Sequence, residues 1–121
     1  MSEKKWNRIK GKLGEDFGEL YLKKQGYRIL ERNVQSPFGE IDLVAFHQGS
    51  LVFVEVKSRQ DDSFGFPEEA INRRKRYQLA KLANWYLTRY PKSPQVRFDV
   101  LAIQVQGSEP GVRLIQNAFE I

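Results

Sequence analysis

The chain lacks cysteine altogether and has a single histidine in 121 residues. The absence of cysteine excludes a disulfide scaffold, a thiol nucleophile, a thiolate zinc site and an iron–sulfur cluster. The one histidine, His47, cannot supply a multi-histidine metal site. No apolar stretch approaches the roughly 18 residues that a membrane helix needs, and the charged residues 1–10 do not resemble a secretory signal. We therefore expect a cytoplasmic protein that does not enter a membrane.

The composition is that of one globular domain with a basic excess. Hydrophobic residues make up 40% of the chain, which is enough for a packed core, and the length suits a single domain over residues 1–121. The net charge is +5, and residues 73–76 have the sequence Arg-Arg-Lys-Arg. A basic cluster of this kind suits a polyanion such as nucleic acid, although a solvated helix face would also explain it.

Periodicity predicts two long helices and four or five strands. Apolar residues at spacings of three and four predict a helix over residues 4–25, with Phe17 and Leu20 on its core face and Gly18 on a flank that another backbone could approach. A second helix is expected from Pro67 to about Tyr90. Strands are expected at residues 27–33, 39–46, 51–57 and 95–104, with a last candidate at 112–119. This order predicts an α/β sandwich whose sheet is covered by the two helices.

The predicted hairpin of residues 39–57 gathers its charges at one end. A four-residue turn at residues 47–50 fixes a register that places Asp42 opposite Glu55 and Glu40 opposite Lys57. These four side chains would share the face that is apolar near the turn. The other face is apolar throughout and comprises Ile41, Leu43, Ala45, Val52, Val54 and Val56.

Two carboxylates across a ladder repel each other unless a proton or a cation lies between them. Lys57 could be that cation in a purely structural ion cluster. A divalent metal explains the pair better, because hard oxygen ligands on a rigid sheet suit Mg²⁺ or Mn²⁺. Asp42 and Glu55 would hold the metal for phosphodiester hydrolysis, and Lys57 would orient the attacking water or balance developing negative charge.

The spacing of Asp42, Glu55 and Lys57 is the D…E-x-K pattern of restriction-endonuclease-like nucleases. Further motifs extend over nearly the whole chain: Gly11-x-x-Gly14-Glu15, Tyr21-Leu22, Gly26-Tyr27, Gly39–Ala45, Val52–Arg59, Arg97–Val100 and Asn117-Ala118-Phe119. Together they resemble the YraN family of small bacterial proteins, which are similar to archaeal Holliday-junction resolvases within the restriction-endonuclease-like group.

The resemblance implies a restriction-endonuclease-like α/β fold with a mixed β-sheet between helices. It also implies that Glu15, Asp42 and Glu55 are acidic site residues and that Lys57 is the site lysine. This chain keeps the full D…E-x-K set. Junction resolvases act as dimers, so the resemblance raises the expectation of a homodimer, although the sequence shows no dimer surface.

Several residues have both a site and a structural interpretation. Glu15 could be a third site carboxylate or a solvated helix residue. Lys75 and Gln78 interrupt an apolar stripe of the second helix, so they would either point into a cleft at a phosphate or emerge into solvent. We interpret Asp99 as a structural hydrogen-bonding acid and His47 as a turn residue.

The sequence as a whole predicts a metal-dependent nuclease that acts on DNA, in branched or otherwise structured form. Arg73, Arg74 and Arg76 would contact backbone phosphates. One alternative is a nucleic-acid-binding protein that keeps this fold without turnover, and another is an interaction protein whose charge cluster is only structural. Cleavage would separate the first two, and divalent-metal binding would argue against the third.

Overall fold

A computed structural model of the chain describes residues 3–59, 72–106 and 109–119. Its elements in chain order are α1 (Glu3–Lys24), β1 (Arg28–Ser36), β2 (Gly39–His47), β3 (Ser50–Arg59), α2 (Arg73–Leu87), β4 (Gln95–Gln106) and β5 (Glu109–Ile115). This is the predicted order of a helix, three strands, a helix and two strands. The last strand ends earlier than expected, because Asn117 has a left-handed φ of 51° and the Ala118 N–H donates to the Phe98 carbonyl at 2.8 Å.

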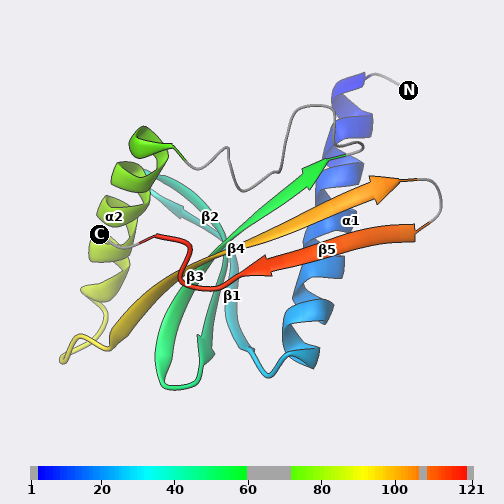
Figure 1. The fold of residues 1–121 in the computed structure, drawn as a ribbon. Coiled ribbons are helices and arrows are strands. Elements are labelled where there is room, and N and C mark those ends of the chain that lie inside the picture. The colour runs from blue at the N-terminus through cyan, green and yellow to red at the C-terminus, as the bar shows by residue number, and fades with distance from the viewer. Residues whose placement is uncertain (1–2, 60–71, 107–108, 120–121) are drawn as a thin grey trace.

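The five strands form one mixed sheet in the order β1-β2-β3-β4-β5 (Figure 1). β3 and β4 are parallel, and the other neighbouring pairs are antiparallel. Parallel neighbours need a crossover connection, and α2 lies in the segment between them. The predicted mixed α/β architecture is therefore confirmed. In the part of the chain that the structure describes, no helix is long and apolar enough to cross a membrane.

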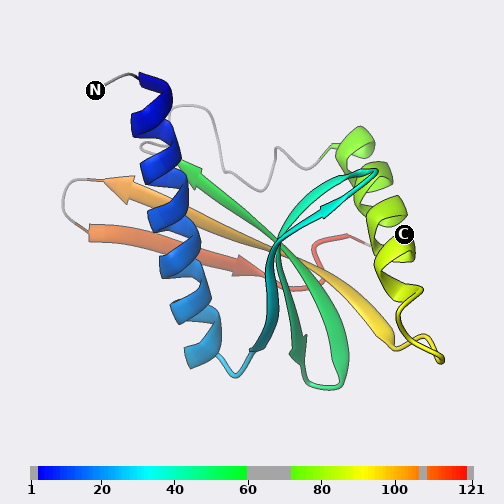
Figure 2. The same cartoon turned by 180° about the vertical axis from the view of Figure 1, so that it is seen from behind.

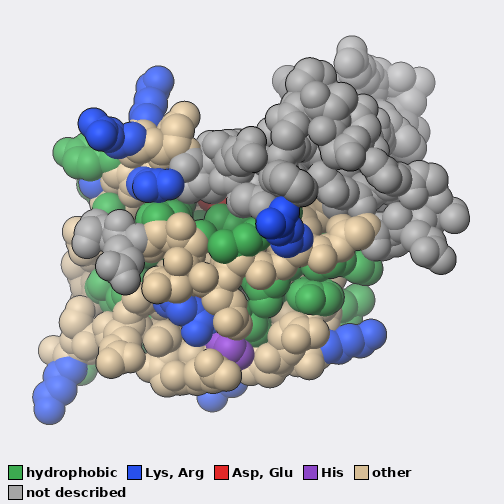
Figure 3. All heavy atoms as spheres, viewed as in Figure 1, with side chains coloured by type: hydrophobic (Ala, Val, Ile, Leu, Met, Phe, Trp, Pro, Cys, Tyr) green, Lys and Arg blue, Asp and Glu red, His purple; other side chains and the backbone are tan. Residues whose placement is uncertain are grey.

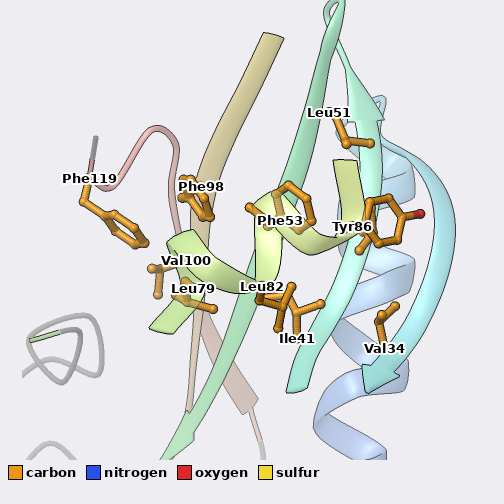
Figure 4. Close-up of a cluster of buried hydrophobic side chains, with 12 residues drawn as sticks. Val34, Ile41, Leu51, Phe53, Leu79, Leu82, Tyr86, Phe98, Val100 and Phe119 are labelled. Atoms are coloured by element: carbon orange, nitrogen blue, oxygen red, sulfur yellow. The ribbon is translucent and has the colours of Figure 1, made fainter. Parts of the chain in front are cut away.

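The two helices cover opposite faces of the sheet (Figures 1 and 2). Successive side chains of a strand point to opposite faces of the sheet, so alternate residues of the central strands pack in two separate cores. Val44 and Phe53 pack under α2, whereas Leu43 and Val54 pack under α1. In the α2 core, Tyr86 meets Phe53 edge to face at a centroid distance of 5.5 Å (Figure 4). The carboxylate-bearing strands are thus held rigidly between two packed layers.

The buried face of α1 is rotated from the predicted one. Leu22 is fully buried, whereas Leu20, expected in the core, is 60% exposed. A Cβ added at Gly18 would lie 2.9 Å from the Leu101 side chain, so the small residue lets α1 lie close to its own sheet. The expected close approach on this flank is therefore made by the chain's own sheet. Adjacent apolar stripes on one helix give the same spacing, so periodicity alone could not choose between them.

Helix α2 begins at Arg73. Asn72 is extended, with φ −85° and ψ 179°, and its side-chain oxygen accepts the Lys75 N–H at 2.9 Å, which makes it the N-cap. The expected start at Pro67 lies outside the described residues. The helix ends at Leu87, three residues before the predicted Tyr90, where the Thr88 hydroxyl donates to the Trp85 carbonyl at 2.8 Å.

The β2–β3 hairpin has the predicted register near its turn. Gln48 and Gly49 both have positive φ, 50° and 82°, which is the type I′ geometry that suits a two-residue hairpin loop. The ladder runs from the His47–Ser50 pair to the Leu43–Val54 pair. Ile41 departs from the prediction, because it packs in the α2 core and not beside Leu43 in the α1 core.

Candidate active site

Strands β2 and β3 separate where the predicted acids lie. The hydrogen-bonded ladder stops at Leu43–Val54, so the expected Asp42–Glu55 and Glu40–Lys57 ladder pairs do not form. Beyond this point β3 stays paired with β4, and the earlier half of β2 stays paired with β1. The Asp42 carboxylate bridges the opening, since its Oδ2 accepts the Val56 N–H at 2.7 Å. Asp42 and Glu55 therefore remain neighbours through a side-chain bond and not through a backbone pair.

Glu55 is a buried carboxylate with an unsatisfied oxygen. The residue is 7% exposed, and its Oε2 atom has no hydrogen-bond partner. Lys75 Nζ lies 3.6 Å from Oε2, and Lys57 Nζ lies 3.9 Å from Oε1. Both distances exceed those of hydrogen bonds, so the lysines balance the charge of Glu55 without occupying its lone pairs. A buried oxygen left in this state is costly for the fold and available to a ligand.

Asp42 has an unusually high affinity for protons. Burial and the facing charge of Glu55 raise the pKa of Asp42 from its usual 3.8 to about 7, against the opposing effect of the Val56 hydrogen bond. The charges of Glu15 and Glu40 raise the Asp42 pKa further. Near neutral pH, either a bound proton or a bound cation would therefore stabilise Asp42 in its buried position.

Glu15 lies close enough to affect Asp42, but it also has a partner of its own. Its Oε2 lies 3.5 Å from the Arg32 guanidinium, which also pairs with Asp16 at 2.6 Å and Glu19 at 3.1 Å. Arg32 of β1 thus clamps three acids of α1 and holds this helix beside the site. Arg32 was not among the predicted site residues. The sequence shows three acids within five residues of one helix, which indicates that a cationic side chain lies nearby but does not identify it.

The first turns of α2 form the other wall of the site. Lys75 Nζ lies 3.6 Å from Glu55 Oε2, so its side chain points toward the carboxylates and not into solvent; its contact with a phosphate stays a prediction. Gln78 packs against Gly39, where φ is +128° and any Cβ would collide with the Gln78 amide. Gly39 therefore allows the β1–β2 hairpin to touch α2.

The three predicted phosphate-binding arginines lie close together in sequence at the start of α2. All are exposed on the first turn of α2. The Arg76 guanidinium lies 5.6 Å from the Phe119 ring centroid and thus extends toward the C-terminal segment. Their contact with nucleic acid stays a prediction.

A second polar cluster is centred on Asp99, which pairs with Val54 in the β3–β4 ladder, and it serves the fold. Asp99 is 1% exposed, and its carboxylate accepts from Arg97, from the Asn117 backbone at 2.9 Å and from Tyr27 at 2.6 Å. Every oxygen is thus satisfied, which agrees with the structural role expected for Asp99. His47 is more than a turn residue, because it is buried, stacks on Tyr27 at 3.9 Å and lies 2.8 Å from Arg97.

An open cavity of about 590 Å³ adjoins this second cluster, between Ser50, Gln95 and Asn117. It does not include the carboxylates. Arg97, which lines it, is already neutralised by Asp99. The Asp42–Glu55 pair and not this cavity is therefore the candidate active site.

The carboxylate pair fits a divalent cation held in part by its substrate. No group of three or more acidic, histidine or cysteine side chains converges on one metal position among the residues described. Mg²⁺ is commonly bound by one or two carboxylates together with substrate phosphates and water. The unsatisfied Glu55 oxygen and the repulsion on Asp42 are what such an ion would relieve.

Comparison with known proteins places this chain within one family. The model of "Uncharacterised protein family UPF0102" matches residues 14–103. A UPF0102 protein of Trichlorobacter lovleyi is 46% identical over 120 residues, which cover 97% of this chain and 94% of the relative. UPF0102 proteins of Syntrophotalea carbinolica and Persephonella marina are 44% and 45% identical, over 92% and 93% of this chain and 91% and 95% of their own lengths.

Proposed function

The protein belongs to the UPF0102 family, and we propose that it is a metal-dependent nuclease that hydrolyses phosphodiester bonds of DNA. The observation that carries this proposal is the environment of the Glu55 carboxylate. It is buried between two lysines with one oxygen that makes no hydrogen bond, and it lies next to Asp42, whose pKa is raised. Lys57 and Lys75 balance the charge of Glu55, but Glu55 Oε2 makes no hydrogen bond and the charge of Glu55 still raises the Asp42 pKa. A bound divalent cation would relieve both.

The arrangement of the sheet supports a more specific proposal about the fold. Asp42 lies on β2, and Glu55 and Lys57 lie two residues apart on the central strand β3. A mixed sheet between two helices with the D…E-x-K pattern on adjacent strands is what a restriction-endonuclease-like fold requires. We include that fold in the proposal.

Each residue of the candidate site has a proposed role in the hydrolysis. Asp42 and Glu55 would hold Mg²⁺ or Mn²⁺, which when bound polarises phosphate oxygens and lowers the pKa of water. Lys57 keeps its ammonium donors free of hydrogen bonds to Glu55, so it can orient the attacking water or stabilise negative charge on the phosphate. Lys75 can hold the same phosphate from the α2 side.

The N-terminus of α2 supports an anionic substrate. Four basic residues, 73–76, occupy its first turn, and no acid does. Cations at this end of a helix oppose the macrodipole and cost about 0.3–1 kcal/mol each. A phosphate backbone beside the helix would remove this repulsion, so the charge pattern suits a nucleic acid better than it suits the free protein.

The proposal is tested by incubating the protein with linear, flapped and four-way DNA in Mg²⁺ or Mn²⁺. We expect cleavage by the wild type, near-complete loss in Asp42→Asn, Glu55→Gln and Lys57→Ala, and retained DNA binding in all three. Lys23→Ala, an exposed lysine on α1, is the matched control and should cleave normally. Wild-type cleavage by Asp42→Asn would refute the site. Binding without cleavage by the wild type would favour the alternative of a non-catalytic nucleic-acid-binding protein.

A further inference from the structure

A surface of exposed aromatic and basic side chains lies beside the candidate active site. Phe38, at the tip of the β1–β2 hairpin, is 41% exposed, and Tyr77 of α2 is 65% exposed. The Lys81 Nζ atom lies 4.5 Å from the Tyr77 ring centroid and 5.9 Å from that of Phe38. These three side chains, which we call the aromatic platform, come from two elements far apart in the chain.

The aromatic platform shares a stripe of α2 with further polar side chains. Arg74, Tyr77, Gln78 and Lys81 are spaced by three, four and seven positions, which places them along one side of the helix. The α2 residues that build the core lie on another side and are Leu79, Leu82, Ala83 and Tyr86. Tyr77 therefore contributes little to the core. Figure 3 shows Lys and Arg side chains gathered around an exposed hydrophobic side chain over the start of α2, at the upper left.

The aromatic platform lies beside the wall of the candidate site. Gln78 packs against Gly39, the residue after Phe38, and Lys75 reaches Glu55 at 3.6 Å. Tyr77 and Lys81 follow Lys75 by two and six positions on α2, so they lie on another side of this helix from Lys75. Phe38 precedes Asp42 by four residues, which is about 13 Å along an extended strand at about 3.3 Å per residue. A strand whose phosphate lies at the carboxylates would thus bring nucleotides a few positions away over the platform.

We propose that the aromatic platform stacks unpaired nucleobases, so that the substrate of this site is DNA with a single-stranded segment next to the scissile phosphate. This inference rests on the proposed nuclease function and specifies its substrate class. Aromatic side chains beside cationic ones are the combination that binds single strands, because every base has a π-face and every nucleotide a phosphate. In a blunt duplex the bases already stack on one another, so no exposed face of a base would be available to the aromatic platform.

The test measures binding without catalysis. Labelled single-stranded DNA and a blunt duplex of the same sequence are titrated with the protein in EDTA, and fluorescence anisotropy is recorded. Stacking is worth about 1–3 kcal/mol per base, so Phe38→Ala and Tyr77→Ala should each weaken single-strand binding by roughly 5- to 150-fold and leave duplex binding nearly unchanged. Tyr77→Phe keeps the ring and should bind normally, whereas Tyr77→Leu should behave like alanine. Leu20→Ala, which removes an exposed apolar side chain on α1, is the control for apolar surface in general.

Each outcome decides the inference independently of cleavage. A preference for single strands that Phe38→Ala and Tyr77→Ala remove supports it, even if the protein cuts no DNA, in which case only the nuclease proposal fails. Equal binding of single strand and duplex by the wild type overturns it, and so does unchanged single-strand binding by both alanine variants. A change of oligomeric state in these variants with no change in DNA affinity would instead assign the surface to a second copy of the chain and would also overturn it.

Discussion

Replacing Asp42 with asparagine is expected to stabilise the metal-free protein at neutral and alkaline pH. Asparagine keeps an oxygen that can accept the Val56 N–H, so the bond that bridges β2 and β3 survives. The substitution removes only the negative charge that burial and Glu55 disfavour. The two lysines of the site lie against Glu55, so neutralising Asp42 does not take away their carboxylate partner.

The size of this effect follows from the shift in the Asp42 pKa. Raising it from 3.8 to about 7 corresponds to an upper limit of about 4 kcal/mol at about 1.36 kcal/mol per pH unit. Solvent relaxation around a half-buried group lowers the value, and we expect about 2 kcal/mol. With an unfolding entropy of about 2.1 cal/mol/K per residue, 121 residues convert each kcal/mol into about 4 °C of Tm. Asp42→Asn should therefore melt about 8 °C above the wild type.

The pH dependence of Tm checks the cause. The folded pKa of Asp42 is higher than the unfolded one, so the folded state retains the proton longer. The contribution of Asp42 to stability is fully present below pH 3.8 and is lost as the pH rises to about 7. The Tm difference between Asp42→Asn and the wild type should thus be near zero at about pH 4 and largest above about pH 7.

Thermal melts with and without Mn²⁺ complete the assay. A ligand that binds only the folded state raises Tm by mass action, so Mn²⁺ should stabilise the wild type and have no effect on Asp42→Asn. Glu55→Gln is the matched comparison and should melt lower without metal, because it leaves Lys57 and Lys75 without their carboxylate. An Asp42→Asn protein that melts below the wild type, together with a wild type indifferent to Mn²⁺, would show that the pair is structural and would refute the nuclease interpretation.

Two further predictions concern DNA binding and the pH profile. Replacing Arg73, Arg74 and Arg76 together should weaken DNA binding and reduce the slope of log affinity against log salt by roughly 0.9 per lost phosphate contact. The control Arg28→Ala on β1 should leave this slope unchanged. An unaltered slope in the triple variant would show that the DNA binds elsewhere. Because a metal needs the ionised carboxylate, the cleavage rate should rise roughly tenfold per pH unit up to the Asp42 pKa of about 7 and then level off; a rate that is flat between about pH 5 and 8 would exclude Asp42 as a ligand.

The sequence pattern predicted the structure correctly where that structure depends on residues close together in the chain. The expected turn at residues 47–50 predicted the hairpin and its register up to Leu43–Val54, although the loop itself is only the two residues Gln48 and Gly49. The same pattern failed at Asp42, where the prediction assumed that the ladder continues. Whether two strands stay paired depends on which other strands compete for them, and here β1 and β4 keep the two strands apart.

The sequence by itself determined the order of elements, the α/β class and the residue types of the site. Alternation and turn chemistry act over a few residues, so they can be recognised without the fold. Only the tertiary structure decided which face of α1 is buried, that Lys75 reaches Glu55, and that Phe38 meets Lys81. These contacts join positions 20 to 83 residues apart in the chain, and the packing of helices on the sheet, which sets them, depends on all the layers at once.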